Sequence, residues 1–236
     1  MTWTTTAVSA TVSALTPYAD PVRAKGAEAY MKHVAPFLGV ATPIRRRELH
    51  AAWHSLPQPT SSDVGDTAAL LMTQREREFH YAAYDLISYY QWVLDAGFLP
   101  TFGARLLTTT PWWDSVDGFV NAMVSPLCLR FGHAYLIDEW SSSDDRWLIR
   151  SAITHQRGWK DRTDFDRVFA ICDRHWPNPE FFIAKAIGWA LRDCARLNPE
   201  MTAQFLAEQT VRNSVAEREI RKGLATVPQR QVVDRP

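Results

Sequence analysis

The sequence of 236 residues lacks a net charge, because 26 lysine and arginine residues balance 26 aspartate and glutamate residues. A chain without an overall positive field is not drawn to nucleic acid or to an anionic membrane by its total charge. Any contact with such a partner must therefore depend on local clusters of basic residues.

Cysteine is also scarce. The chain has three cysteines, Cys128, Cys172 and Cys194. Their odd number and the lack of Cys-x-x-Cys spacing argue against a disulfide framework and against a zinc site. We interpret them as small core residues of a protein from the reducing cytoplasm. His50 and His54 lie four residues apart, but no third ligand is near them in the sequence. We therefore expect no metal and no cofactor.

Long hydrophobic runs are missing as well. No stretch approaches the roughly 20 apolar residues that span a bilayer. No basic residue precedes Arg23, so the beginning of the chain does not resemble a secretory signal. We expect a soluble, cytoplasmic protein that does not act at a membrane.

Strand patterns are few, whereas large apolar residues recur every 34 positions. The series is Phe79, Trp113, Trp147 and Phe181, and Val215 continues it. Each of these residues opens a segment with helical periodicity, and small residues such as Ala83, Ala152 and Ala186 follow. This period is typical of stacked helical hairpins. An ordinary helical bundle with chance spacing is the alternative.

The chain shows no linker that would divide it, so we expect a single domain over residues 1–236. Within it we expect a variable N-terminal segment (1–24), helical repeats to about Gly223, and a loose polar tail (225–236). Two proline segments, Phe98-Leu99-Pro100 and Trp176-Pro177, are expected to end helices.

The hexapeptide Trp112-Trp113-Asp114-Ser115-Val116-Asp117 is the most specific feature of the chain. On a helix, Trp113 and Asp117 share a face because they are four residues apart. A carboxylate beside an electron-rich ring is suited to stabilising a cation. The other two residues have simpler interpretations: Trp112, like Trp147, as core, and Asp114 as an acidic residue in the first turn of a helix.

Positive charge gathers in three places along the chain. These are Arg45 to Arg47, then Arg146, Arg150, Arg157 and Lys160, and finally Lys185 with Arg192. In a curved array, Arg150 and Lys185 would line one groove, because they are 35 residues apart, and such a groove could follow a phosphate backbone. The alternative for any one cluster is a solvated helix face.

Three segments closely resemble the AlkD-type alkylpurine DNA glycosylases, a family of HEAT-like repeat proteins that repair alkylated DNA. They are Tyr30–Lys32 with Phe37–Arg46, then Thr110–Asp117, and finally Phe181–Arg192, and the resemblance extends from about Tyr30 to Arg221. It implies an all-α fold, a curved right-handed superhelical solenoid of HEAT-like repeats with a concave groove for double-stranded DNA. It also implies a monomeric, nucleoid-associated enzyme of base excision repair.

The resemblance carries roles over to individual residues. Asp117 takes the place of the catalytic carboxylate, Trp113 and Trp189 are the aromatic walls, and Arg150 lies near the lesion backbone. Further positions match the family's contacts to DNA: Tyr30, Thr42, Arg45, Arg46 and Arg192, to which the groove argument adds Lys185. Two alanines, Ala41 and Ala184, stand where polar residues are expected, so contacts there are not carried over.

The implied reaction is hydrolysis of the N-glycosidic bond of cationic N3- or N7-alkylpurines in duplex DNA without flipping the base into a pocket. The substrates would extend to bulky minor-groove adducts of the duocarmycin and yatakemycin type, which would make the protein an antibiotic self-resistance enzyme. The competing hypothesis is a non-catalytic HEAT-repeat scaffold that binds DNA or protein, because helical arrays commonly bind without chemistry.

Overall fold

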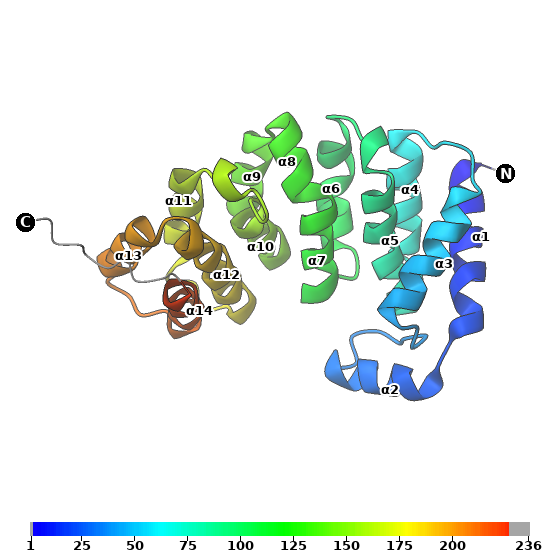
Figure 1. Ribbon diagram of the computed structural model, residues 1–236, viewed down its shortest axis with the longest axis horizontal. Coiled ribbons are helices and arrows are strands. Elements are labelled where there is room, and N and C mark those ends of the chain that lie inside the picture. The colour runs from blue at the N-terminus through cyan, green and yellow to red at the C-terminus, as the bar shows by residue number, and fades with distance from the viewer. Residues whose placement is uncertain (1, 227–236) are drawn as a thin grey trace, which may run out of the picture. The chain divides into compact units, whose positions relative to one another are not determined.

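A computed structural model describes residues 2–226, and in this range the chain consists of helices and loops without strands (Figure 1). The expected all-α class is confirmed. Contacts divide the chain into two compact units, one ending at His133 and one beginning at Ala134. The assignment of a single domain stays a prediction, and the expected C-terminal tail falls, beyond Thr226, outside the described residues.

The first unit contains α1 (Trp3–Leu15), η1 (Thr16–Tyr18), α2 (Pro21–Tyr30), α3 (Thr42–His54), α4 (Ser61–Leu71), α5 (Arg77–Tyr89), η2 (Gln91–Val93), α6 (Phe98–Thr108), α7 (Trp113–Phe119), η3 (Val120–Val124) and α8 (Ser125–Phe131). The second contains α9 (Ala134–Ser141), α10 (Arg146–Thr154), η4 (Lys160–Arg162), α11 (Phe165–His175), α12 (Phe181–Leu197), α13 (Pro199–Glu208) and α14 (Ser214–Ala225).

The 34-residue series marks the starts of helices. Its five members lie within the first three residues of α5, α7, α10, α12 and α14, in that order. The small residues that follow are completely buried at Ala83, Ala152 and Ala186. Each repeat therefore begins a helix with a large side chain and then allows a neighbouring helix to approach closely. The prediction of a helical-repeat fold is confirmed.

Helices of the first unit pack in the order of the chain, with α1 against α3 and α4, α4 against α5 and α6, and α5 against α7 and η3. In Figure 1, α2 lies crosswise below the ends of α1 and α3. The N-terminal segment is thus helical and packed. Trp53 is completely buried and donates its indole N–H to Thr11 Oγ1 on α1 at 3.0 Å.

The two proline segments behave differently from each other. Trp176-Pro177 follows the end of α11 at His175, as expected. Phe98-Leu99-Pro100 instead begins α6, so the expectation of a helix end there was wrong. A proline is tolerated in the first turn because the N–H groups there have no acceptor within the helix.

In the second unit α12 is the longest helix, and α10, α11, α13 and α14 all pack against it. The contact with α14 is especially close at Gly188. A Cβ atom there would lie 2.9 Å from Cβ of Glu219 and 3.1 Å from Cα of Ala216. Glycine is therefore what lets the backbones of α12 and α14 approach each other.

Candidate active site

The helix α7 begins immediately after an extended residue, Trp112, whose φ is −151°. Ser115 closes the first turn, because its hydroxyl donates to the carbonyl of Trp112 at 3.1 Å and accepts from the Trp112 N–H at 3.4 Å. The turn presents Trp113 at the first helical position and Asp117 four residues later, both half-buried. The expected shared helix is confirmed for these two residues.

Trp113 lies beside a residue from far back in the chain. Its ring centroid is 6.4 Å from that of Tyr30, at an interplanar angle of 77°. Tyr30 is the last residue of α2 and is 71% exposed. The fold therefore brings two of the predicted site residues together on the surface of the first unit.

Asp114 is held by α5. The guanidinium of Arg77, which is 1% exposed, donates from Nη2 to Asp114 Oδ1 at 2.6 Å and from Nε to Asp114 Oδ2 at 3.2 Å. The Tyr81 hydroxyl donates to the same Oδ2. Burial, together with the negative charge of Asp114, raises the pKa of Tyr81 above its ordinary value, so this hydroxyl stays protonated.

Further along α5, Tyr84 supports the middle of α7. A Cβ atom added to Gly118 would lie 2.4 Å from Cδ1 of the Tyr84 ring, so this ring rests directly on the backbone next to Asp117. Burial raises the pKa of Tyr84 to about 12. Besides the charged Arg77, the α5 side chains that face α7 are thus two tyrosines that remain uncharged at neutral pH.

The predicted DNA-contact residues of α3 divide into exposed and buried ones. Thr42 is exposed at the first position of the helix, and the side chain of Arg46 is 59% exposed. Arg45 instead has a side chain only 4% exposed, with Nε 3.0 Å from Asp85 Oδ2. Its guanidinium carbon lies 4.9 Å from the centroid of the Tyr81 ring. Arg45 is therefore buried where α3 packs against α5.

In the second unit, Trp189 on α12 is half-buried and lies beneath two guanidinium groups. The guanidinium carbon of Arg150 is 5.0 Å, and that of Arg157 5.4 Å, from a ring centroid of Trp189. Arg150 is 1% exposed and donates from Nη1 to the carbonyl oxygen of Phe182 at 2.6 Å. Cation–π contacts of this kind hold the indole in one orientation.

The remaining two predicted basic residues, Lys185 and Arg192, share one carboxylate. Lys185 Nζ is 3.0 Å from Glu219 Oε1, and Arg192 Nη1 is 3.0 Å from Glu219 Oε2. Lys222 adds a third contact at 3.1 Å. Burial would raise the pKa of Glu219, but hydrogen bonds from Lys185 and Lys222 outweigh it and lower that pKa to about 2. Three positive side chains thus meet one carboxylate where α12 packs on α14.

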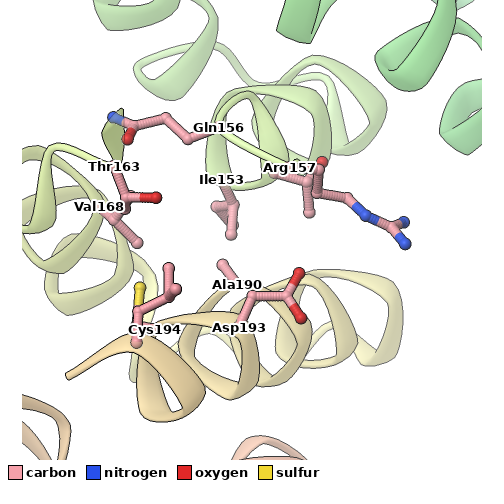
Figure 2. A pocket seen from close by; sticks show the side chains of 10 residues that line it. Ile153, Gln156, Arg157, Thr163, Val168, Ala190, Asp193 and Cys194 are labelled. Carbon is pink, nitrogen blue, oxygen red and sulfur yellow. The ribbon is translucent and has the colours of Figure 1, made fainter. Parts of the chain in front are cut away.

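A small cavity lies between α10, α11 and α12, in the same unit as Trp189. Figure 2 shows Ile153, Val168 and Ala190 pointing into it from α10, α11 and α12. Its volume is about 20 Å³. That is room for about one water molecule and far too little for a purine base.

Comparisons with known proteins identify the family to which the chain belongs. A family model described as "DNA alkylation repair enzyme" matches residues 11–223. The chain belongs to this DNA alkylation repair enzyme family. A solved structure described as "Predicted DNA alkylation repair enzyme from Enterococcus faecalis" is 27% identical, with a TM-score of 0.78, over 89% of this chain and 98% of that one. No match was found among curated proteins.

Membership of the DNA alkylation repair enzyme family gives the protein a role in DNA repair, and DNA is its partner. Between residues 2 and 226 no helix is long and apolar enough to cross a membrane. In the same part of the chain no group of three His, Cys, Asp or Glu side chains could hold a metal ion.

Several residues that shape the site were missed from the sequence. Arg77 lies in the charged run Arg75-Glu76-Arg77-Glu78, which reads as a solvated surface. In the structure both Arg77 and Glu78 are buried. The Glu78 carboxylate accepts hydrogen bonds from the backbone N–H groups of residues 38–40. The one available signal was separation by about one repeat: 37 residues part Arg77 from Asp114, and 34 part Lys185 from Glu219.

Proposed function

We propose that this protein is a DNA glycosylase that hydrolyses the N-glycosidic bond of N3- and N7-alkylpurines in duplex DNA. The observation that carries the proposal is α7, which presents an indole and a carboxylate four residues apart in a chain of the DNA alkylation repair enzyme family. Arg77 and Tyr81 on α5 bind Asp114, and we assign the chemistry to Asp117.

The chemistry requires stabilisation of a cation. Alkylation at N3 or N7 makes the purine a good leaving group, and as the glycosidic bond stretches the deoxyribose acquires oxocarbenium character. A carboxylate at about 4 Å, with an effective dielectric constant of about 20, attracts such a charge by about 4 kcal/mol. Because this attraction grows as the bond breaks, it lowers the barrier, by on the order of a thousandfold in rate. The same carboxylate can orient the attacking water.

We assign the aromatic walls to Trp113 and Trp189, whose π-faces would each add about 0.5 to 2 kcal/mol toward a nearby cation. Both are half-buried, so each offers part of its ring to a ligand. We propose that the base remains stacked in the duplex during excision and is not captured in a pocket, which is the mode that the resemblance to the AlkD-type glycosylases implies. A mode of that kind would also admit bulky minor-groove adducts, and thereby a role in antibiotic self-resistance.

Contacts to the DNA backbone are proposed for the exposed and half-buried residues of the predicted set. These are Tyr30, Thr42, Arg46, Lys185 and Arg192. For Arg45 and Arg150 we propose a supporting role, because both are buried and bound to neighbouring protein groups. Electrostatic contacts to phosphates predict that binding weakens steeply as salt rises.

The decisive experiment measures base release from a duplex that carries one N7-methylguanine, under single-turnover conditions. We expect Asp117→Asn to lower the rate by about a thousandfold, because it removes the charge but keeps the shape. Affinity for the duplex should stay within about twofold, and a no-protein reaction corrects for spontaneous depurination.

Two results would contradict the proposal. If the wild type releases base no faster than buffer, the scaffold hypothesis is favoured instead. If wild type and Asp117→Asn release base equally fast, the carboxylate is assigned wrongly. A separate reaction, with a duplex that carries a bulky minor-groove adduct, tests the wider substrate range. Mass photometry of the protein–DNA complex tests whether the protein acts as a monomer.

A further inference from the structure

Every N–H donor of Arg77 has an acceptor, and most of the acceptors belong to the start of α7. Nε and Nη2 bind the two oxygens of Asp114, and Nη2 also donates to Ser115 Oγ at 2.8 Å. Nη1 donates to the carbonyl of Thr110 and to Nδ1 of His80, each at 3.0 Å. A guanidinium has five N–H groups in a rigid fork, so all of them are satisfied here.

The partner of Arg77 is equally occupied. Asp114 accepts two hydrogen bonds from Arg77 and one from Tyr81, and its side chain is 9% exposed. A carboxylate bound in this way has little capacity to meet a substrate or to orient a water molecule. Of the two carboxylates in the hexapeptide, we therefore assign a structural role to Asp114 and the role toward the substrate to Asp117.

Three side chains of α5 form the surface on which α7 rests. Arg77, Tyr81 and Tyr84 occur at positions i, i+4 and i+7, so they share one face of α5. The first two hold Asp114 at the start of α7, and the third packs on Gly118. We call these three residues the α5 platform.

Helix α7 continues directly into η3 at Val120 and α8 at Ser125, so its seven residues are the first two turns of a longer helix. The orientation of these first turns depends on tertiary contacts, which supply most of the stability of helices in proteins. Trp113 precedes Asp114 by one residue and Asp117 follows it by three, so whatever fixes Asp114 fixes the direction of both. A displacement of about 1 Å at a reacting group is enough to lower a rate by about a hundredfold.

Stability alone does not account for an ion pair in this place. Removing two charges from water costs several kcal/mol per ion, and apolar side chains of similar size often stabilise a protein as well. A buried bidentate pair does provide a fixed geometry, because the guanidinium fork matches a carboxylate in one orientation. We therefore interpret the α5 platform as a group of residues that fixes the orientation of α7.

We propose that Tyr81 and Arg77 are positioning residues, which act through Asp114 to fix the orientation of Trp113 and Asp117 for base excision. This inference rests on the proposed glycosylase function and deepens it. It adds to that function two residues of α5 that touch neither DNA nor the reacting atoms, and it assigns different roles to the two carboxylates of the hexapeptide.

The test compares Tyr81→Phe with a matched control, Tyr90→Phe. Both variants delete one buried tyrosine hydroxyl in the first unit: Tyr81 binds Asp114, whereas Tyr90 donates to the carbonyl of Trp53 at 2.9 Å and does not contact α7. The phenylalanine at position 81 keeps the ring against Arg45. Single-turnover rates, duplex affinity and hydrogen exchange of the peptide 113–119 are measured for both, well below the unfolding temperature.

We expect Tyr81→Phe to lower the rate of base release by about tenfold to a hundredfold, with duplex affinity within about twofold. Exchange in α7 should become faster in this variant. Tyr90→Phe should match the wild type in rate and in α7 exchange, even where it unfolds at a lower temperature. As a second variant, Asp114→Asn should slow release and retain measurable activity, unlike Asp117→Asn.

Failure of the inference and failure of the proposed function give different results. If the wild type releases base and Tyr81→Phe equals Tyr90→Phe in rate, positioning is overturned and the glycosylase function stands. If Asp114→Asn is as inactive as Asp117→Asn, the division of roles between the two carboxylates is overturned. If the wild type releases no base, the proposed function fails, and the catalytic meaning of the α5 platform fails with it.

Discussion

At the scale of single residues, individual side-chain contacts determine how the start of α7 is held. Asp114 and Asp117 are the same residue type three positions apart, and their surroundings give them different properties. The first is fixed by Arg77 and Tyr81. Gly118, next to the second, is where the ring of Tyr84 meets the helix backbone. Because Gly118 has no side chain, the Tyr84 ring can pack directly on the backbone beside Asp117.

Replacing Gly118 by alanine is expected to destabilise the protein by about 1 to 3 kcal/mol, because the new methyl group would overlap the Tyr84 ring and force it to move. Urea unfolding of the purified variant measures this change. Gly26→Ala is the matched control, since a Cβ atom there meets nothing within 4 Å. That variant should be as stable as the wild type or more so by about 0.5 to 1 kcal/mol. Equal stability of both variants would show that Tyr84 does not pack as described.

At the scale of helices, the second unit is organised around α12, which carries Trp189, Lys185 and Arg192. Its closest neighbour is α14, which approaches at Gly188 and supplies Glu219 as the shared partner of the two basic side chains. Sequence order does not show this pairing, because α13 separates the two helices. The final described helix therefore helps to hold two of the predicted site residues, Lys185 and Arg192.

Glu219→Gln is expected to lower the free energy of unfolding by about 1 to 2 kcal/mol at pH 7, less than for a fully buried pair because the cations are partly exposed. The pKa of Glu219 is lowered to about 2 in the folded state. Its contribution is therefore complete above the unfolded pKa of 4.5 and is lost as the pH falls toward 2.

Chemical denaturation at several pH values measures this effect. The gap in stability between wild type and Glu219→Gln should narrow between pH 4.5 and pH 2. Glu208→Gln, at an exposed residue of α13 that binds Gln204, should change stability by less than about 0.5 kcal/mol at any pH. A constant gap across the range would contradict the proposed charge pairing.

At the scale of the whole molecule, the total charge is zero, yet stability should still depend on pH. Four histidines have a pKa lowered by burial, and they are His80, His133, His155 and His175. A lowered pKa means that the unfolded chain binds a proton more readily than the folded one. Stability is therefore complete above the unfolded pKa of 6.5 and decreases as the pH falls below it.

His155 should dominate this decrease, since burial lowers its pKa to about 4 and its Nδ1–H is bound to the carbonyl of Ala152. We expect a loss of about 3 kcal/mol from this residue between pH 6.5 and pH 4. His155→Gln should be less stable at pH 7 and should lose less stability on acidification. The exposed His54→Gln variant should follow the wild type. An unchanged pH slope in His155→Gln would contradict the assignment.

How much of the molecule could be predicted from its sequence depends on the kind of pattern involved. Phe79, Trp113, Trp147 and Phe181 marked helix starts, because burial of a large side chain once per repeat leaves a regular trace. Arg77 left no such trace. A buried arginine and an exposed one are the same letter, and the difference depends on an acceptor 37 residues away. For the same reason Arg45 was grouped with its exposed neighbour Arg46.

The close contact of α12 with α14 has a consequence for how the protein is made. A ribosome delivers Trp189 well before Glu219, so a nascent chain that has just exposed α12 still lacks the helix that neutralises Lys185 and Arg192. These two side chains then lack their carboxylate partner, and the flank of α12 at Gly188 is open to water. The second unit acquires its packed form only after α14 has been synthesised, and a message truncated shortly before position 214 would yield a product in which α12 lacks this neighbour.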